Sequence, residues 1–253
     1  MDFKKKILVL KMNIKDIQLM KNIISQIGDM NNGNKVLFCV SYERIAKTNL
    51  ILLRAFLEEL NKKGILVTID RPHQYMEHLL RMHRINYENL LFIDTIARFS
   101  GNILSDDLSV GNIRILDSPF QIDLLPGLFA LNPEEQIEVE GQIDITGLDF
   151  ILIDNVATML NYNDPTSVES FLENYMAKFR NLNNILISLT LDSVAYNSLY
   201  QVARRLFDRE INIDNLRIGK LDFDREMKER SLLSDKKTML DLFSYRKCFS
   251  EGD

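Results

Sequence analysis

Tryptophan is absent from the 253-residue sequence, and it contains only two cysteines and three histidines. Cys39 and Cys248 form no C-x-x-C pair, and this sparse use of cysteine favours a reducing cytoplasm. The histidines at 73, 78 and 83 are five residues apart, so on a helix they point about 140° away from one another and cannot share a metal ion. No stretch approaches the roughly 18 apolar residues of a membrane span. The sequence therefore predicts a soluble, cytoplasmic protein with no membrane partner and gives no firm indication of a cofactor.

A surplus of basic charge is also missing. The chain has 31 Lys and Arg against 36 Asp and Glu, for a formal net charge of -5. No stripe of arginines with interleaved aromatic residues is present, so nucleic acid is not indicated as a partner. With 46% hydrophobic and 26% charged residues, the composition is that of an ordinary globular protein.

Short apolar runs alternate with longer amphipathic stretches along the chain. The runs predict strands over residues 7–10, 35–40, 65–70, 89–96, 113–117, 149–154, 184–190 and near 211–218. Between them, helices are expected over 15–29, 46–63, 72–85, 165–182 and 193–208, the second of them stopped by Gly64. Because the strands are continuously apolar, they should be buried on both faces of a mostly parallel sheet. We expect a three-layer α/β/α domain over residues 1–220 and a charged helical tail over 221–253.

The segment "VLFCVSYERIAKTNLILL", residues 36–53, has the layout of a strand, a phosphate-binding loop and a helix. Such a loop reads G-x-x-x-x-G-K-[ST]. Lys47 and Thr48 stand at the expected places, but Ser41 and Ala46 replace the glycines. About a hundred residues later, the strand "FILID" ends in the lone carboxylate of Asp154, as a metal-holding aspartate would.

These segments, together with "GILVTIDRPHQYMEHLL", "DFILIDNVATMLNYND" and "RLFDREINI", resemble the RecA-like ATPases of the KaiC and archaeal recombinase group. The resemblance is greatest to archaeal members with a degenerate Walker A motif, and it implies a RecA-like P-loop NTPase fold. It makes Lys47 the phosphate-binding lysine, Thr48 the Mg²⁺ hydroxyl ligand and Asp154 the Walker B carboxylate. Relatives that hydrolyse ATP have a catalytic glutamate where this chain has Asp70.

The departures in the loop argue against strong nucleotide binding. Glycine allows backbone conformations that a Cβ disfavours, so strain at Ser41 and Ala46 is expected to cost about 1 to 3 kcal/mol each. Glu43 adds a carboxylate near the expected triphosphate, worth about 1 to 4 kcal/mol of repulsion. Asp70 stands where the catalytic glutamate is expected, but it is an aspartate followed by Arg71-Pro72, which argues against activation of the attacking water.

Each candidate residue also has a simpler interpretation. Lys47 and Thr48 could be ordinary first-turn helix residues, Asp154 could cap the turn "NVATML", and Asp70 could belong to a turn. Arg204 and Arg205 could face a neighbour's nucleotide or form a solvated helix face.

The leading hypothesis is a RecA-like, non-hydrolysing pseudo-ATPase that binds or regulates a protein partner as a monomer or small homodimer. The alternatives are a divergent ATP-binding protein or ATPase that uses Lys47, Thr48 and Asp154 with Mg²⁺, and a sheet-end pocket for another small ligand.

Overall fold

The computed structural model describes residues 13–28, 35–101, 109–110, 112–116, 118–120, 122–130, 142–182 and 184–216. The expected strand over residues 7–10 and the expected C-terminal tail over 221–253 lie outside the described residues.

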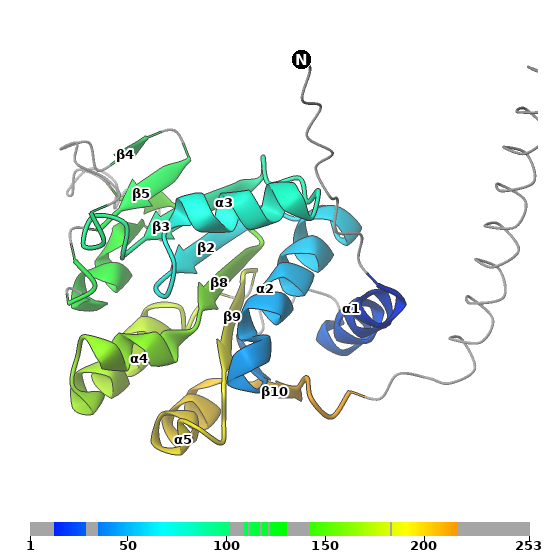
Figure 1. Cartoon of the computed structure of the whole chain (residues 1–253). Helices are drawn as coiled ribbons and strands as arrows, with labels where there is room; N and C mark the ends of the chain where they lie inside the picture. The colour runs from blue at the N-terminus through cyan, green and yellow to red at the C-terminus, as the bar shows by residue number, and fades with distance from the viewer. Residues whose placement is uncertain are drawn as a thin grey trace, which may run out of the picture. The chain divides into compact units, whose positions relative to one another are not determined.

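One sheet organises this part of the chain (Figure 1). Its strand order is β10-β1-β9-β8-β2-β3-β5-β4, and every neighbouring pair is parallel except β4 with β5. The strands are β1 (Lys35–Cys39), β2 (Gly64–Thr68), β3 (Leu90–Asp94), β4 (Ser109–Val110), β5 (Ile113–Ile115), β8 (Phe150–Asp154), β9 (Leu186–Leu191) and β10 (Arg209–Asn212). A separate pair is formed by β6 (Phe129–Ala130) and β7 (Ile143–Asp144).

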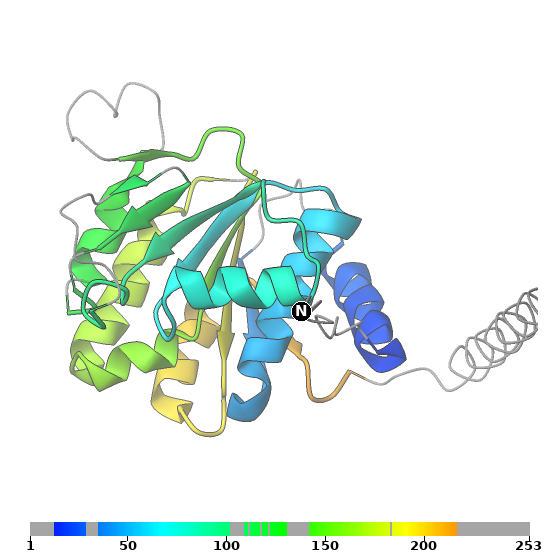
Figure 2. The same cartoon turned by 45° about the horizontal axis from the view of Figure 1, so that its top comes forward.

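Helices cover both faces of the sheet (Figures 1 and 2). One layer contains α1 (Ile14–Ile27), α2 (Ile45–Arg54) and α3 (His73–Met82). The other contains α4 (Pro165–Lys178) and α5 (Asn197–Leu206), with the short 3-10 helices η4 (Ile122–Leu128) and η6 (Val156–Asn161). The expected three-layer α/β architecture with a mostly parallel sheet is confirmed.

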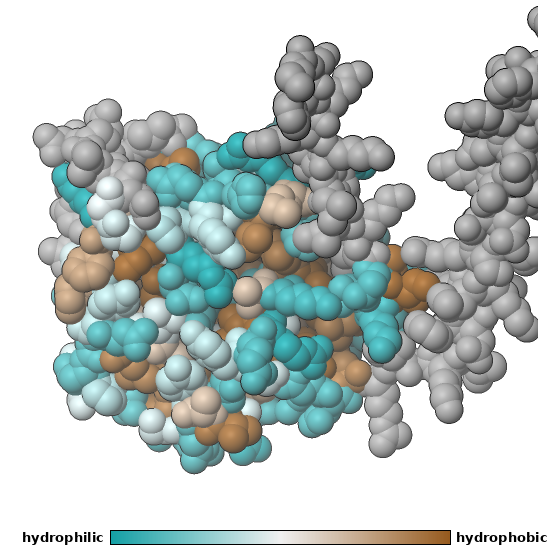
Figure 3. All heavy atoms as spheres, in the orientation of Figure 1, coloured by the Kyte–Doolittle hydropathy of each residue, from teal (hydrophilic) through white to brown (hydrophobic). Residues whose placement is uncertain are grey.

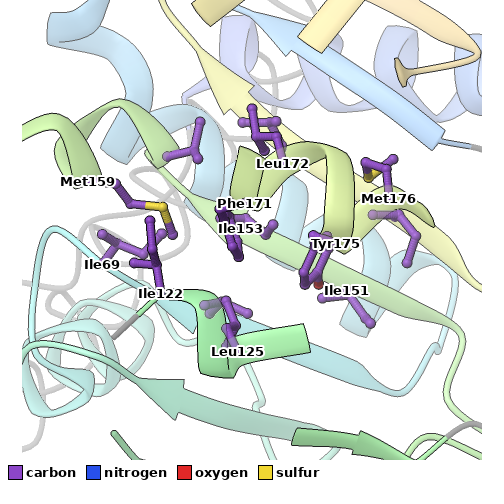
Figure 4. Close-up of a cluster of buried hydrophobic side chains, with 14 of the residues drawn as sticks. Ile69, Ile122, Leu125, Ile151, Ile153, Met159, Phe171, Leu172, Tyr175 and Met176 are labelled. Atoms are coloured by element: carbon purple, nitrogen blue, oxygen red, sulfur yellow. The ribbon is translucent and has the colours of Figure 1, made fainter. Parts of the chain in front are cut away.

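Burial on both faces explains the continuous apolar runs. In β1, Leu37 and Cys39 pack in the core under α4 and α5, while Val36 and Phe38 pack under α1, α2 and α3. Figure 4 shows the first of these cores, in which side chains of α4 and η4 meet those of β8. Cys39 is a buried core residue, and its burial raises the pKa of its thiol to about 12, as expected for a small hydrophobe rather than a nucleophile.

The expected helix over 46–63 is shorter than its sequence pattern. After α2 the chain makes a π-helical turn over Ala55–Glu59, and Asn61 then takes a left-handed conformation with φ of 49°. Gly64 therefore does not stop the helix but is the first residue of β2. Its role is to leave room for the ring of Phe150, its partner residue on β8.

Replacing Gly64 by alanine should destabilise the protein by about 1 to 3 kcal/mol. The added Cβ would lie 2.5 Å from the Phe150 ring, which is fully buried and packs on Phe56 with centroids 4.9 Å apart. Urea unfolding followed by circular dichroism measures the effect. Gly127→Ala is the matched control, because a Cβ there meets no atom within 4 Å. Equal unfolding midpoints for the two variants would contradict the packing argument.

Candidate functional site

The candidate site is the edge of the sheet where the parallel strands end. β1, β2, β8 and β9 all terminate there, and ligands of open α/β sheets bind at this edge. The segment that joins β1 to α2 crosses it, and Asp154 is the last residue of β8.

The connection from β1 to α2 is a tight turn. Residues Tyr42–Arg44 form one 3-10 turn that leads directly into α2, and the amide of Arg44 donates to the Ser41 carbonyl at 2.9 Å. Ser41 has φ of -57°, and no residue of 41–48 is among those with positive φ. The backbone strain expected at Ser41 and Ala46 is therefore absent, because the chain adopts a conformation that needs no glycine.

Two aspartates accept hydrogen bonds from the amides of this turn. Asp214 Oδ2 accepts from the amide of Ser41 at 2.7 Å, and Asp192 Oδ2 accepts from the amide of Tyr42 at 2.9 Å. Asp214 also pairs with the guanidinium of Arg44. These aspartates follow β10 and β9, the strands on either side of β1, so the sheet order itself brings them to the turn. Two backbone amides of this turn are thus already hydrogen-bonded to carboxylates of the protein.

Asp192 is held in its charged form. Its burial alone would raise its pKa, but the amides of Ala195, Tyr42 and Val194 donate to the carboxylate and bring the pKa below its usual value. The hydrogen bonds from Val194 and Ala195 are both 2.9 Å long. They also form a turn that delays the start of α5 from the expected residue 193 to Asn197.

Lys47 points to the helical layer. Its Nζ lies 2.6 Å from Asp16 Oδ1 of α1, and its side chain is about half exposed. Ala46 and Lys47 both line a pocket of about 390 Å³ between α1, α2 and α3. In Figure 3, hydrophobic surface is visible between α2 and α3, the two helices that supply most of this pocket's lining.

Asp154 contacts α2 through a residue that the sequence analysis missed. Asn49 Nδ2 donates to Asp154 Oδ1 at 2.5 Å, whereas its neighbour Thr48 is buried and has no such contact with Asp154. The interpretation of Asp154 as a cap of the following turn is wrong, because Asn155 occupies the N-cap position of η6. The signal for Asn49 was a polar side chain at the start of the apolar run "NLILL".

The charge of Asp154 is disfavoured by its surroundings. The pKa of Asp154 is raised to about 6, chiefly because the carboxyl is buried; Arg71 and the hydrogen bond from Asn49 oppose this rise, and the charge of Asp70 adds to it. Asp70 itself lies in the turn after β2, in an ion pair of 3.1 Å with Arg71. The structure thus brings Asp70 within electrostatic reach of Asp154 but pairs it with its own neighbour.

Several buried polar atoms near Asp154 have no hydrogen-bond partner within the described residues. They are Oδ2 of Asp154, Oδ1 of Asn49, Oδ1 of Asn155, Oγ1 of Thr190 and Nη1 of Arg71. Thr190 follows Leu189, the partner of Ile153 on the neighbouring strand, so it stands beside Asp154 at the sheet edge. Unsatisfied groups of this kind favour water as a partner. No group of three or more His, Cys, Asp or Glu in the described ranges is placed to hold a metal ion.

A second buried carboxylate lies at the end of β3. Asp94 accepts from the amide of His73 at 2.5 Å and from the amides of Ile96 and Ala97 at 2.9 and 2.8 Å. The ring Nδ1 of His73 lies 2.7 Å from the same carboxylate. His73 and Asp94 are both buried, so this pair joins the start of α3 to the sheet.

Arg204 and Arg205, which the sequence suggested could face the nucleotide of a neighbouring subunit, lie in the last turn of α5. Arg204 is exposed, and its Nε lies 3.8 Å from Oε2 of Glu210 on β10. Arg205 is exposed as well.

No described helix is long and apolar enough to cross a bilayer.

The chain is similar in structure to two proteins of the hyperthermophilic archaeon Pyrococcus horikoshii. The uncharacterized protein PH0321, crystallised in complex with an unknown peptide, aligns with a TM-score of 0.51 and 14% identity over 76% of this chain and 82% of that one. The KaiC-like protein PH0186 aligns with a TM-score of 0.46 and 13% identity over 74% and 76%. No protein-family profile and no curated protein sequence matches the chain. The likeness to PH0321 shows a shared fold.

Proposed function

We propose that this chain is a RecA-like, KaiC-like domain that has lost nucleotide hydrolysis and acts by binding another protein. In this proposal the Walker A motif is degenerate, Ser41, Ala46, Lys47 and Thr48 are remnants of a phosphate loop, and Asp154 is a remnant of a Walker B residue. The protein acts as a monomer or a small homodimer.

The observation that carries the proposal is the pairing of the turn with Asp192 and Asp214. A triphosphate would have to displace two carboxylates from the amides of Ser41 and Tyr42, and its own negative charges would be repelled by them. Lys47, the one cation that the motif supplies, is already paired with Asp16. The residues present therefore fit a magnesium nucleotide poorly.

The metal side of the motif supports the same conclusion. Asp154 offers a carboxylate whose burial raises its pKa to about 6, and it receives a hydrogen bond from the neutral amide of Asn49. Mg²⁺ prefers several charged or water oxygen ligands in octahedral geometry. A binding role also agrees with PH0321, the protein of the same fold that was crystallised with a peptide.

Calorimetric titration of the purified chain with magnesium-ATP and magnesium-ADP tests the proposal. We expect dissociation constants in the high micromolar range or weaker, and no ATP turnover above background. Lys47→Ala should leave this weak signal unchanged, as should Lys63→Ala, the control at the opposite edge of the sheet. Sub-micromolar binding that Lys47→Ala abolishes and Lys63→Ala preserves would establish the alternative, a divergent ATP-binding protein or ATPase.

A further inference from the structure

Three aromatic rings form a cluster at the surface, here called the aromatic patch, that comprises the exposed Phe99 and Phe120 and the partly buried Tyr162. All three pairs of rings are close to perpendicular, with centroids 5.5 to 5.7 Å apart. Phe99 and Phe120 are 51% and 53% exposed. The rings come from three separate segments: the turn after β3, the segment before η4 and the residue after η6. Single exposed apolar residues are common on protein surfaces, but a contiguous cluster marks an interaction site.

The patch is held in place by polar contacts beneath it. Asn163 Nδ2 donates to the carbonyl of Pro119 at 3.0 Å and to the carbonyl of Met159 at 3.1 Å. The first bond fixes the residue before Phe120 to the end of η6, next to Tyr162. The rings are therefore pre-positioned in the free protein, which lowers the entropy lost when a ligand binds.

A groove of about 410 Å³ opens beside the patch. Phe120 forms part of its lining, and the buried side chains of Ile122 and Phe171 contribute apolar surface. Its other lining residues are polar: Asp123, Asn163, Asp164, Thr166, Ser167, Ser170 and Asn174. Among the lining residues that the structure describes, the charged ones are these two aspartates.

Both aspartates can present negative charge to a ligand. Asp164 caps α4 by accepting hydrogen bonds from the hydroxyl of Ser167 at 2.6 Å and from its amide at 3.0 Å. These bonds hold the pKa of Asp164 below its usual value, so it stays ionised near neutral pH. Asp123 is exposed in the first turn of η4.

We propose that the aromatic patch and this groove bind an extended segment of a partner protein in which an arginine or lysine stands beside an apolar residue. The apolar residue packs on Phe99, Phe120 and Tyr162. The cation enters the groove, where Asp123 and Asp164 complement its charge and the face of Phe120 adds a cation–π contact. The charged residues described in this lining are both negative, which disfavours nucleic acid, because its binding depends on cations that neutralise phosphates. The proposal goes beyond the loss of nucleotide binding and does not depend on the turn at Ser41.

Selection of a random dodecapeptide phage library on the full-length chain tests this inference. The selected peptides should carry arginine or lysine next to a leucine or an aromatic residue. Their labelled synthetic forms are then titrated by fluorescence anisotropy. Phe120→Ala should weaken binding about tenfold or more, as expected for a central aromatic contact. Phe99→Ala should weaken it as well, whereas Tyr75→Ala, which removes an equally exposed ring from α3, should leave it unchanged.

A double-mutant cycle tests the charge contact. Replacing the peptide arginine by neutral citrulline should weaken binding to the natural chain about three- to tenfold, and should have little effect on Asp123→Asn, where the carboxylate is already gone. Circular dichroism checks that each variant is folded.

Selection without a basic consensus, or peptides that bind Phe120→Ala and Asp123→Asn as tightly as the natural chain, would overturn the inference. Binding of oligo(dT) that is lost in Phe120→Ala would overturn it in favour of nucleic acid. Either result leaves the ATP titration untouched, so failure of this inference and failure of the proposed loss of nucleotide binding can be told apart.

Discussion

Asp94→Ala should lower the free energy of unfolding by about 3 to 5 kcal/mol, a large fraction of the stability of an average domain. The Asp94 side chain is fully buried and interacts with two groups of His73 and with the amides of Ile96 and Ala97. Removing it leaves those donors in the interior without an acceptor. Urea unfolding of the natural chain and the variant, followed by circular dichroism, measures the difference.

A surface carboxylate provides the control for this loss. Glu77 pairs with Arg81 four residues later on α3, in a bridge of 2.7 Å whose arginine is mostly exposed. Such pairs contribute about 0.3 to 0.5 kcal/mol, so Glu77→Ala should barely move the unfolding midpoint. Asp94→Asn keeps one acceptor oxygen, so its unfolding midpoint should lie between those of Asp94→Ala and Glu77→Ala. If Asp94→Ala unfolded at the same urea concentration as Glu77→Ala, the network around His73 would contribute nothing to stability.

The contact between Asp94 and His73 illustrates what local sequence could not predict. The residue at the N-cap of α3 is Pro72, which has no side-chain acceptor, so local capping rules find no partner for the first amides of the helix. The acceptor comes from β3, 21 residues later in the sequence. The predicted strand over 89–96 contains Asp94, but the contact of Asp94 with His73 depends on β3 lying beside β2, which leads into α3.

The central strands β1, β2, β3, β8 and β9 were predictable because each of them is a continuous apolar run in the sequence. The short strands β4, β6 and β7 were not predicted, and β10, Arg209–Asn212, begins before the expected position near 211–218. The expected strand over 149–154 is β8, Phe150–Asp154, with every residue buried. Helix ends were less predictable because tertiary contacts set them. The ring of Phe150 explains why Gly64 belongs to β2, and the hydrogen bonds to Asp192 explain why α5 begins at Asn197.

The candidate site was predictable in position but not in its partners. The spacing of the motif located Lys47 and Asp154 at the start of α2 and the end of β8. The motif could not show that Lys47 pairs with Asp16. Nor could it show that Asp192 and Asp214 accept hydrogen bonds from the backbone amides of the turn. Those contacts follow from the positions of α1, β9 and β10, which no local pattern specifies.

Asp154→Asn should stabilise the protein at pH 7 by about 3 kcal/mol, the equivalent of a carboxyl pKa raised from about 3.9 to about 6. The unfolded chain ionises this carboxyl first, so between these two values the folded protein binds more protons. Stability therefore falls as pH rises through this window and stays lower above pH 6. Asparagine keeps the oxygen that accepts from Asn49 and removes the charge that burial disfavours.

Urea unfolding midpoints of the natural chain and of Asp154→Asn are measured at pH 4, 5, 6 and 7. The difference between the two midpoints at each pH reports the titration of Asp154, because all other carboxyls are common to both proteins. That difference should be small at pH 4 and grow towards pH 7. Asp70→Asn should move the inflection to lower pH, because it removes a negative charge that raises the pKa of Asp154. The positive charge of Arg71, which lowers the pKa of Asp154, remains in this variant. In a working magnesium site the charge of Asp154 would be needed, and neutralising it would abolish stabilisation by magnesium-ATP. A natural chain that magnesium-ATP stabilises at pH 7, with that gain lost in Asp154→Asn, would therefore contradict both this prediction and the proposed loss of nucleotide binding.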